Sequence, residues 1–400
     1  MNHTGNGPLR GLRVIELASY VAGPLGGLTL AQLGADVLRV DPLGGTPDRR
    51  RWPLAPSGAS LYWTGLNRGK RSIALDLRTA HGRQLLAELV AGAGTVLTNA
   101  GGRPGQRYED LRAARDDLIY VEVAGARGGR GSVDYTADAA AGFPLATGTP
   151  ETSEPTGHVL PAWDVACGLY AAVALLAAQH DRTATGRGAH LVLGLDDVAL
   201  ATAGNLGYLA EAELTGAGRP RVGNAVYGTY GHAFATRDGH IMIVALTARH
   251  WNDLLAATGL TVATRAIEAA LGTDFTLEEE RYRHQRLLDA LLQPWFTARS
   301  TAEAEAALRP TSVLWSRFRT FREIVTDGRD ELLAGPVFDV LDQPGVGPHL
   351  APGSPITRGG RTLGGPHPAP GLGEHTREVL TELGRTPADI DQLIDSGIVA

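Results

Sequence analysis

The chain has 400 residues, of which 43% are hydrophobic and 20% are charged, a balance typical of a folded protein and not of a disordered one. Its formal net charge of −6 provides no general attraction to nucleic acid or to anionic lipid. A single cysteine, Cys167, excludes an intramolecular disulfide and a cysteine-built metal cluster. The N-terminal residues lack a signal-peptide pattern and no apolar run reaches the roughly 18 residues of a membrane span, so we expect a cytoplasmic protein.

Short apolar runs alternate with segments of helical spacing over the first 125 residues. This alternation indicates parallel strand pairing in a doubly wound sheet, whose ligands usually bind at the carboxyl ends of the strands. We therefore predict an α/β fold with a large Rossmann-like domain. The predicted elements are strands at 13–17, 36–40, 72–77, 94–97 and 118–123, and helices at 23–34 and 79–90.

The middle of the chain begins with a stretch rich in Gly and Pro, residues 125–161, which has no clear period and is expected to form active-site loops. The following helix, 164–180, is apolar nearly all round, which predicts that it is buried. A further strand is predicted at 189–195 and a further helix at 196–214.

The pattern changes at residue 227, where two apolar runs, 231–236 and 240–246, flank the hairpin signal Arg237-Asp238-Gly239. Amphipathic helices follow, including 287–296 and 302–308, and the Gly- and Pro-rich tail ends in a short helix near 376–383. Because 400 residues exceed what one core usually supports, we expect a second domain of the α+β type. The expected organisation is a large domain at 8–226, a small domain at 227–330 and a segment at 331–400 that returns to the large domain.

Asp164 is the candidate nucleophile. It lies at the start of the apolar helix, where the helix dipole and free backbone N–H groups stabilise negative charge and are expected to keep the carboxylate ionised. An ionised carboxylate in a dry pocket can attack an acyl thioester and form a mixed anhydride. The alternative is that Asp164 serves only as a helix cap, a position that Asp favours.

Two loops carry cations that suit phosphate: one contains Lys70 and Arg71, and the other, after the fourth strand, contains Asn99, Arg103 and Arg107. The alternative for both is a solvated loop. Lys70 is the one lysine among 37 basic residues, which suggests a narrow cleft beside a phosphate that a guanidinium cannot enter, although codon drift would also explain it. Neither loop matches a dinucleotide fingerprint, so a nicotinamide dehydrogenase is a weak alternative, and no histidine pair has metal-ligand spacing.

In this order and spacing, several short segments resemble family III CoA-transferases, the group that includes formyl-CoA transferase, carnitine CoA-transferase and α-methylacyl-CoA racemase. The resemblance implies that Asp164 is the catalytic aspartate, acting through an aspartyl anhydride and an aspartyl-CoA thioester. It further implies an interlocked homodimer without a permanently bound cofactor, with coenzyme A entering as part of the substrate. The matching segments are 9–17, 22–24, 34–37, 67–73, 185–188 and 373–376. The CoA-binding residues expected on this basis are Tyr20, Val21, Lys70, Arg71, Asn99, Arg103 and Arg107.

A narrower group of segments resembles a branch that moves CoA between the two carboxyl groups of one mesaconate molecule. These segments are 22–27, 51–53, 133–136 and 158–164. The racemase branch is unlike this chain, because Val133-Asp134 stands where that branch has a His-Asp pair and two-base proton exchange then lacks one partner. The glycine run of formyl-CoA transferase is replaced by Asn224-Ala225-Val226-Tyr227-Gly228, which leaves open how the active-site lid closes. Intermolecular CoA transfer between two acids, and acyl-CoA binding without catalysis, remain the alternatives.

Overall fold

The computed structural model describes residues 7–126 and 130–400, which form two compact units. The first comprises the chain up to Ala141 together with His158–Leu209 and Asp330–Ala400, and the second comprises Gly142–Gly157 and Ala210–Arg329. The second unit is therefore larger than the expected domain at 227–330. Its two pieces are held together by Arg221, whose guanidinium donates to the carbonyl oxygens of Leu145, Thr152 and Glu154.

A six-stranded sheet forms the centre of the first unit, and all of its neighbouring strands pair in parallel, which confirms the predicted α/β class. The strand order is β3-β2-β1-β4-β5-β6, so the order reverses between β1 and β4. A reversal of this kind opens a crevice at the carboxyl ends of the two strands. The strands are β1 (Arg13–Leu17), β2 (Asp36–Asp41), β3 (Arg71–Ala74), β4 (Thr95–Thr98), β5 (Ile119–Ala124) and β6 (Ala189–Gly194).

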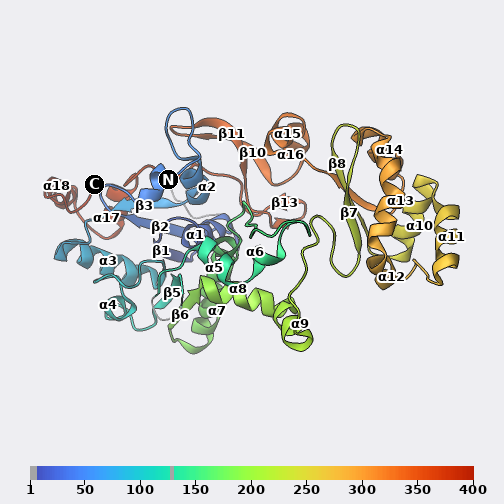
Figure 1. The fold of residues 1–400 in the computed structure, drawn as a ribbon. Coiled ribbons are helices and arrows are strands. Elements are labelled where there is room, and N and C mark those ends of the chain that lie inside the picture. Colours follow the sequence, from blue (N-terminus) through green and yellow to red (C-terminus); the bar gives the residue numbers. More distant parts are fainter. Residues whose placement is uncertain (1–6, 127–129) are drawn as a thin grey trace. The chain divides into compact units, whose positions relative to one another are not determined.

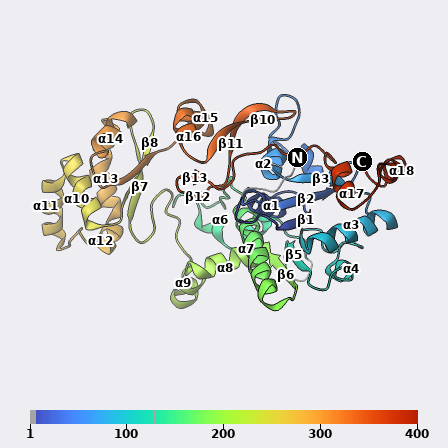
Figure 2. The ribbon, with the colours of Figure 1, turned by 180° about the vertical axis from the view of Figure 1, so that it is seen from behind.

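Helices cover both faces of this sheet (Figure 1). On one face, buried side chains of α3, α17 and α18 form a continuous apolar core with strand residues such as Ile15, Val40 and Val96. Helices α1 and α7 pack against each other on the other face, and Figure 2 shows them side by side. The helices of this unit are α1 (Ala22–Gln32), α2 (Leu61–Asn67), α3 (Ala80–Ala93), α4 (Tyr108–Arg112), α5 (Asp134–Ala140), α7 (Ala162–Thr185), α8 (Leu195–Asn205), α17 (Thr376–Glu382) and α18 (Pro387–Asp395), with a 3₁₀ turn at Pro47–Arg50.

Glycine permits the close packing of α1. A Cβ atom at Gly168 of α7 would lie 2.7 Å from the carbonyl oxygen of Ala22, and one at Gly27 would lie 1.8 Å from a carboxylate oxygen of Glu16. Real Cβ atoms essentially never approach other atoms this closely, so glycine is needed at Gly168 for α7 to pack against α1 and at Gly27 for α1 to pack over Glu16.

The last residues of the chain lie beside β3. The backbone N–H of Ala400 donates to the carbonyl oxygen of Ala74 at 3.2 Å, and that of Asp76 donates to Ile398 at 2.9 Å. Leu75 and Val399 form an antiparallel bridge between these two hydrogen bonds. The C-terminal segment therefore covers the edge of the sheet where β3 ends.

Helix α7 departs from its prediction in two ways. It extends from Ala162 to Thr185 and ends at Gly186, whose φ of 71° is the left-handed conformation of a helix C-cap. It is also not buried all round, because Leu169, Tyr170 and Val173 are exposed. Its length and apolar composition match a membrane span, but it packs against α1, β5 and β6 as the core helix of a domain does.

The second unit has the expected α+β composition. The hairpin of β7 and β8 is antiparallel, as predicted, and β9 joins it as a third strand. Buried aromatic side chains of the strands and helices, among them Phe234, Trp251 and Phe296, form its core. Its elements are β7 (Tyr230–Ala235), β8 (His240–Ala245), β9 (Leu314–Arg317), α6 (Phe143–Ala146), α10 (Ala248–Thr258), α11 (Thr261–Leu271), α12 (Glu278–Arg283), α13 (Gln285–Thr297), α14 (Thr301–Leu308) and α15 (Phe321–Thr326).

Several short elements were not predicted. Helices α5 and α6 lie within the stretch expected to be loop, since seven and four residues are too few to display a helical period. The tail contains two antiparallel hairpins, β10 (Phe338–Gln343) with β11 (Gly347–Pro352) and β12 (Thr357–Arg358) with β13 (Arg361–Thr362), and the short helix α16 (Arg329–Ala334) precedes them. The helix predicted at 196–214 is divided into α8 and α9 (Tyr208–Thr215).

Candidate active site

A groove of about 1020 Å³ lies at the carboxyl edge of the sheet. The residues after β1, β2, β3 and β4 line it, so it occupies the crevice that the reversal of strand order opens. Three of the predicted ligand residues are here: Tyr20, Asn99 and Arg103. Asn99 fixes the loops after β1 and β4 to each other, because its amide accepts from the Ser19 N–H at 3.2 Å and donates to the Ser19 carbonyl at 2.8 Å.

Tyr20 has a strained backbone. Its φ is 67°, which lies in the left-handed region. No other non-glycine residue in the described part of the chain has a positive φ. Such strain costs of order 1–3 kcal/mol and persists where the surroundings enforce it. Asp48 holds Tyr20 in this conformation, since one of its carboxylate oxygens accepts a hydrogen bond from the Tyr20 N–H at 2.8 Å. The aromatic ring is thereby held at the wall of the groove, partly exposed.

Asp164 is the third residue of α7, and a second carboxylate holds this end of the helix. Oδ2 of Asp134 accepts from the backbone N–H of Trp163 at 2.7 Å and from that of Asp164 at 3.0 Å. Asp134, and not Asp164, is therefore the residue that caps the helix, which removes the structural alternative for Asp164. Within the part of the chain that the structure describes, no donor is bonded to the Asp164 carboxylate.

The pKa of Asp164 is raised to about 6, first because burial removes water from the carboxylate and second because Asp134 places a like charge beside it. Arg51 opposes both effects. The helix terminus was expected to keep the carboxylate ionised although it is partly buried, whereas burial and Asp134 raise its pKa. At pH 7 the group is still mostly ionised, and a carboxylate whose pKa lies near the working pH is a more basic nucleophile than one with a pKa near 4.

Arg51 and Tyr62 connect this carboxylate with the groove. The guanidinium carbon of Arg51 lies 4.7 Å from the ring centre of Tyr62 and 5.5 Å from that of Tyr20, and its charge lowers the pKa of Asp164. Burial raises the pKa of the Tyr62 hydroxyl, and the nearby charge of Asp164 adds to the effect. Neither Arg51 nor Tyr62 was assigned to the site from the sequence, because nothing in the pattern links residues 51 and 62 to residue 164.

Lys70 and Arg71 lie in a different environment from the one expected. The ammonium of Lys70 has no exposed surface and donates to Glu16 Oε1 at 3.0 Å, Asn67 Oδ1 at 2.9 Å and the carbonyl of Pro24 at 2.8 Å. All three of its protons are thus bonded within the protein, which leaves none for a phosphate. Arg71 is buried and binds the carboxylates of Asp36 and Glu382.

Two more expected ligands, Val21 and Arg107, do not line the groove. Val21 is buried at the start of α1, and Arg107 donates to the carbonyl of Gly102. Arg78 and Arg83, which were missed, line the groove after β3; the rule that ligands bind where parallel strands end could have found them. In the described residues, no group of three or more His, Cys, Asp or Glu side chains is arranged to hold a metal ion.

Comparisons with known proteins show the family. The family model described as CoA-transferase family III matches residues 9–376. The 2-methylfumaryl-CoA isomerase of Chloroflexus aurantiacus is 45% identical, over 98% of this chain and 98% of the relative. A succinyl-CoA–D-citramalate CoA-transferase of the same organism is 30% identical over 96% of each chain. The crystal structure of a CAIB/BAIF family protein from Brucella suis has a TM-score of 0.78 and 28% identity, covering 94% of this chain and all of that one. The chain belongs to CoA-transferase family III and is an enzyme of that family.

Proposed function

We propose that the enzyme moves CoA between the two carboxyl groups of mesaconate (2-methylfumarate) within one molecule. The observation that carries the proposal is the carboxylate of Asp164, which is partly buried, receives no hydrogen bond from the described residues and has a pKa of about 6. Such a group is free to attack, unlike a carboxylate already bound by donors. The 45% identity to a 2-methylfumaryl-CoA isomerase supports this substrate.

The reaction begins when the Asp164 carboxylate attacks the thioester carbonyl. The C–S bond breaks, CoA leaves as a thiolate, and an anhydride joins Asp164 to the mesaconyl group. The thiolate then attacks the aspartyl carbonyl, which releases mesaconate as a dicarboxylate and leaves an aspartyl-CoA thioester. No proton is gained or lost in these two steps.

The second half of the reaction uses the other carboxylate of the released acid. That carboxylate attacks the aspartyl-CoA carbonyl, CoA leaves again, and a second anhydride forms. Attack of the thiolate on the mesaconyl carbonyl of this anhydride gives the isomeric thioester and regenerates the carboxylate of Asp164. The atoms balance without an external acceptor, provided that mesaconate stays in the site between the halves.

The groove holds the CoA part of the substrate in this proposal. Its volume of about 1020 Å³ suits an extended cofactor, and Arg78, Arg83 and Arg103 line it with positive charge suited to phosphates. Arg51 lies beside Tyr20, which lines the groove, and its charge acts on Asp164, so it stabilises the carboxylates that form and disappear during the exchange.

A homodimer is part of the proposal. The outer face of α7 exposes Leu169, Tyr170 and Val173, and Val192 is exposed on β6, the edge strand of the sheet. An exposed apolar face beside a sheet edge is typical of a surface covered by another subunit. Sedimentation of the wild-type chain should give twice the monomer mass of 42.0 kDa. The double variant Tyr170→Glu/Val173→Glu should shift the equilibrium between monomer and dimer toward the monomer.

The deciding experiment follows one carbon-labelled substrate. Labelled 2-methylfumaryl-CoA is incubated with the enzyme and a tenfold excess of unlabelled mesaconate, and the thioesters are separated by mass-resolved chromatography. We expect the isomeric thioester with its label retained. Rapid appearance of unlabelled thioester would instead establish intermolecular transfer, as in the succinyl-CoA–D-citramalate CoA-transferase relative.

Hydroxylamine tests the covalent step separately. Added during turnover, it should convert Asp164 to a hydroxamate and inactivate the enzyme, and peptide mapping locates the modification. Modification at another residue, or none, contradicts the assignment of the nucleophile. Asp164→Asn should still bind the substrate but lose almost all turnover and the reaction with hydroxylamine. A protein that only binds acyl-CoA would keep its function in this variant and would not react with hydroxylamine at all.

A further inference from the structure

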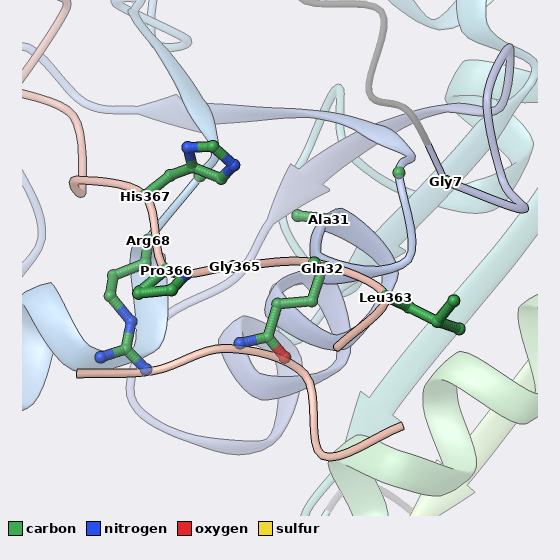
Figure 3. Close-up of a pocket in the computed structure, with 11 residues that line it drawn as sticks. Gly7, Ala31, Gln32, Arg68, Leu363, Gly365, Pro366 and His367 are labelled. Carbon is green, nitrogen blue, oxygen red and sulfur yellow. The ribbon is translucent and has the colours of Figure 1, made fainter. Parts of the chain in front are cut away.

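A second, smaller pocket of about 230 Å³ lies at the opposite edge of the sheet, where β2 and β3 begin. It is formed between the end of α1, the residues before β3 and a glycine-rich piece of the tail (Figure 3). Polar groups of Gln32, Arg68 and His367 reach it, and glycines supply most of the remaining wall. The proposed CoA chemistry makes no use of this pocket.

Arg68 is buried in this pocket without a counter-charge. The residue is 8% exposed, and its Nε atom is fully buried without a hydrogen-bond partner. Among the residues that the structure describes, no carboxylate lies within ion-pair distance of its guanidinium. The stretches outside that range, Met-Asn-His-Thr-Gly-Asn at 1–6 and Arg-Gly-Gly at 127–129, contain no Asp or Glu that could supply one.

Other buried arginines of the same unit are neutralised. Arg39 binds the carboxylates of Glu16 and Asp41, and Arg71 binds those of Asp36 and Glu382. Burial lowers the pKa of the Arg68 guanidinium, and no neighbouring acid counteracts the effect. Because a buried charge without a partner is costly, such groups are normally paired. The expected partner of Arg68 is therefore an anion from outside this part of the chain.

The shape of the pocket indicates what kind of anion. Figure 3 shows the guanidinium of Arg68 and the amide of Gln32 on the same side of the tail segment, whereas the ring of His367 extends on the other. A Cβ atom at Gly364 would lie 2.1 Å from the carbonyl oxygen of Gln32, so glycine is required for the tail to approach this closely. The volume of about 230 Å³ lies below the roughly 300–1,000 Å³ of pockets for drug-sized ligands, which favours a small ion over a nucleotide.

We propose that this pocket binds a small tetrahedral oxyanion, of the phosphate or sulfate class, between the guanidinium of Arg68 and the side-chain amide of Gln32. Guanidinium donates two parallel N–H groups to such an anion, and a side-chain amide adds a third. Asn67, the preceding residue, accepts from both Arg39 and Lys70. An anion bound to Arg68 would therefore stabilise the segment that connects α2 with the buried side chains of Arg39 and Lys70.

Thermal unfolding of the full chain in two buffers tests the proposal. One buffer contains potassium phosphate, and the other contains Tris and potassium chloride at equal ionic strength. Phosphate at ten times its dissociation constant should raise the Tm of the wild type by about 2 °C more than that of Arg68→Met. Subtracting the variant removes the general stabilisation that phosphate gives to any protein.

Arg68→Met also makes a prediction in the chloride buffer. Met has a similar length and no charge, so the variant should be as stable as the wild type or more stable there, because an unpaired buried charge has been removed. A variant that is less stable by the same amount in both buffers would mean that Arg68 is only structural, and the anion site would be refuted. Equal Tm increases in phosphate for both proteins would refute it as well.

Two further variants locate the effect. Gln32→Leu should weaken phosphate binding several-fold, measured as the phosphate concentration at half of the Tm increase. Arg78→Ala, in the groove at the other edge of the sheet, should keep the full increase. If Arg78→Ala abolishes it and Arg68→Met does not, phosphate acts in the groove. If a carboxylate of a second copy is the partner, Arg68→Met should weaken the dimer in sedimentation and lower Tm equally in both buffers, and the free-anion proposal then fails.

Discussion

Two carboxyl groups of the first unit, Glu16 and Asp164, differ in what surrounds them although burial raises the pKa of both. Glu16 has no exposed surface, and its oxygens lie 2.8–3.1 Å from Lys70 and Arg39. Asp164 is partly exposed, has a like charge beside it and receives no hydrogen bond on its carboxylate from the described residues. Desolvation alone therefore does not mark a nucleophile. In the proposed mechanism, the nucleophile is the carboxylate that receives no hydrogen bond from the described residues.

Replacing the unbound carboxylate should have the largest effect. We expect Asp164→Asn to lower the rate of thioester isomerisation by about 10³-fold or more, because removal of a covalent nucleophile leaves only binding and electrostatic effects. Steady-state chromatography of the two isomers measures this. The matched control is Asp181→Asn, an exposed position at the other end of α7, which should retain full activity. A loss of less than tenfold for Asp164→Asn would contradict the assignment.

Removing a cation from the paired carboxylate, Glu16, should lower the stability of the fold instead of the rate. Lys70→Met leaves Glu16 buried with one of its two cations, and we expect a loss of about 3–5 kcal/mol in the free energy of unfolding, measured in urea. Lys70→Arg should also be less stable, since a planar guanidinium does not fit the three acceptors of a compact ammonium.

Arg103→Ala, in the groove, should affect substrate binding and not stability. It should raise the KM for the acyl-CoA about tenfold, the effect of one lost charge-assisted contact, without changing the free energy of unfolding. A raised KM in Lys70→Arg at unchanged stability would restore the expectation that Lys70 contacts a phosphate.

The raised pKa of Asp164 should lower the free energy of unfolding at neutral and alkaline pH. An acid whose pKa rises from 3.8 to about 6 on folding destabilises the protein when it is ionised, fully above pH 6 and not at all below pH 3.8. At pH 8, Asp164→Asn should raise the free energy of unfolding by about 1–2 kcal/mol, after allowance for the solvent that reaches the group. Unfolding curves at pH 4 and pH 8 test the sign, since the gain should be nearly absent at pH 4.

The smallest expected effect concerns the like charge. Asp134→Asn keeps an oxygen that can accept from the N–H groups of Trp163 and Asp164 but removes the charge that raises the pKa of Asp164. The acid limb of the kcat/KM profile should therefore move to lower pH, by up to about one pH unit. A role of Asp134 that is only structural would lower kcat/KM at every pH and leave the midpoint in place.

The sequence predicted what depends on local pattern. Alternating strands and helices gave the parallel sheet, and the position of Asp164 at the start of an apolar helix gave the candidate nucleophile. The sequence pattern did not predict which cations are neutralised, because their partners are distant in sequence. Lys70 pairs with Glu16, and Arg71 pairs with Glu382. For the same reason Arg51 was missed, and Asp134 was not recognised as the cap of a helix that begins 28 residues later, at Ala162.

The pairing of residues 398–400 with the end of β3 has a consequence for the time at which the enzyme becomes active. Residues 75–78, which follow that strand, form one wall of the groove. During synthesis the other strands of the sheet can assemble as they leave the ribosome, but this wall gains its neighbour only when residues 398–400 emerge. The groove therefore cannot be complete before those residues are made, and a variant that lacks them would keep this wall without its neighbour.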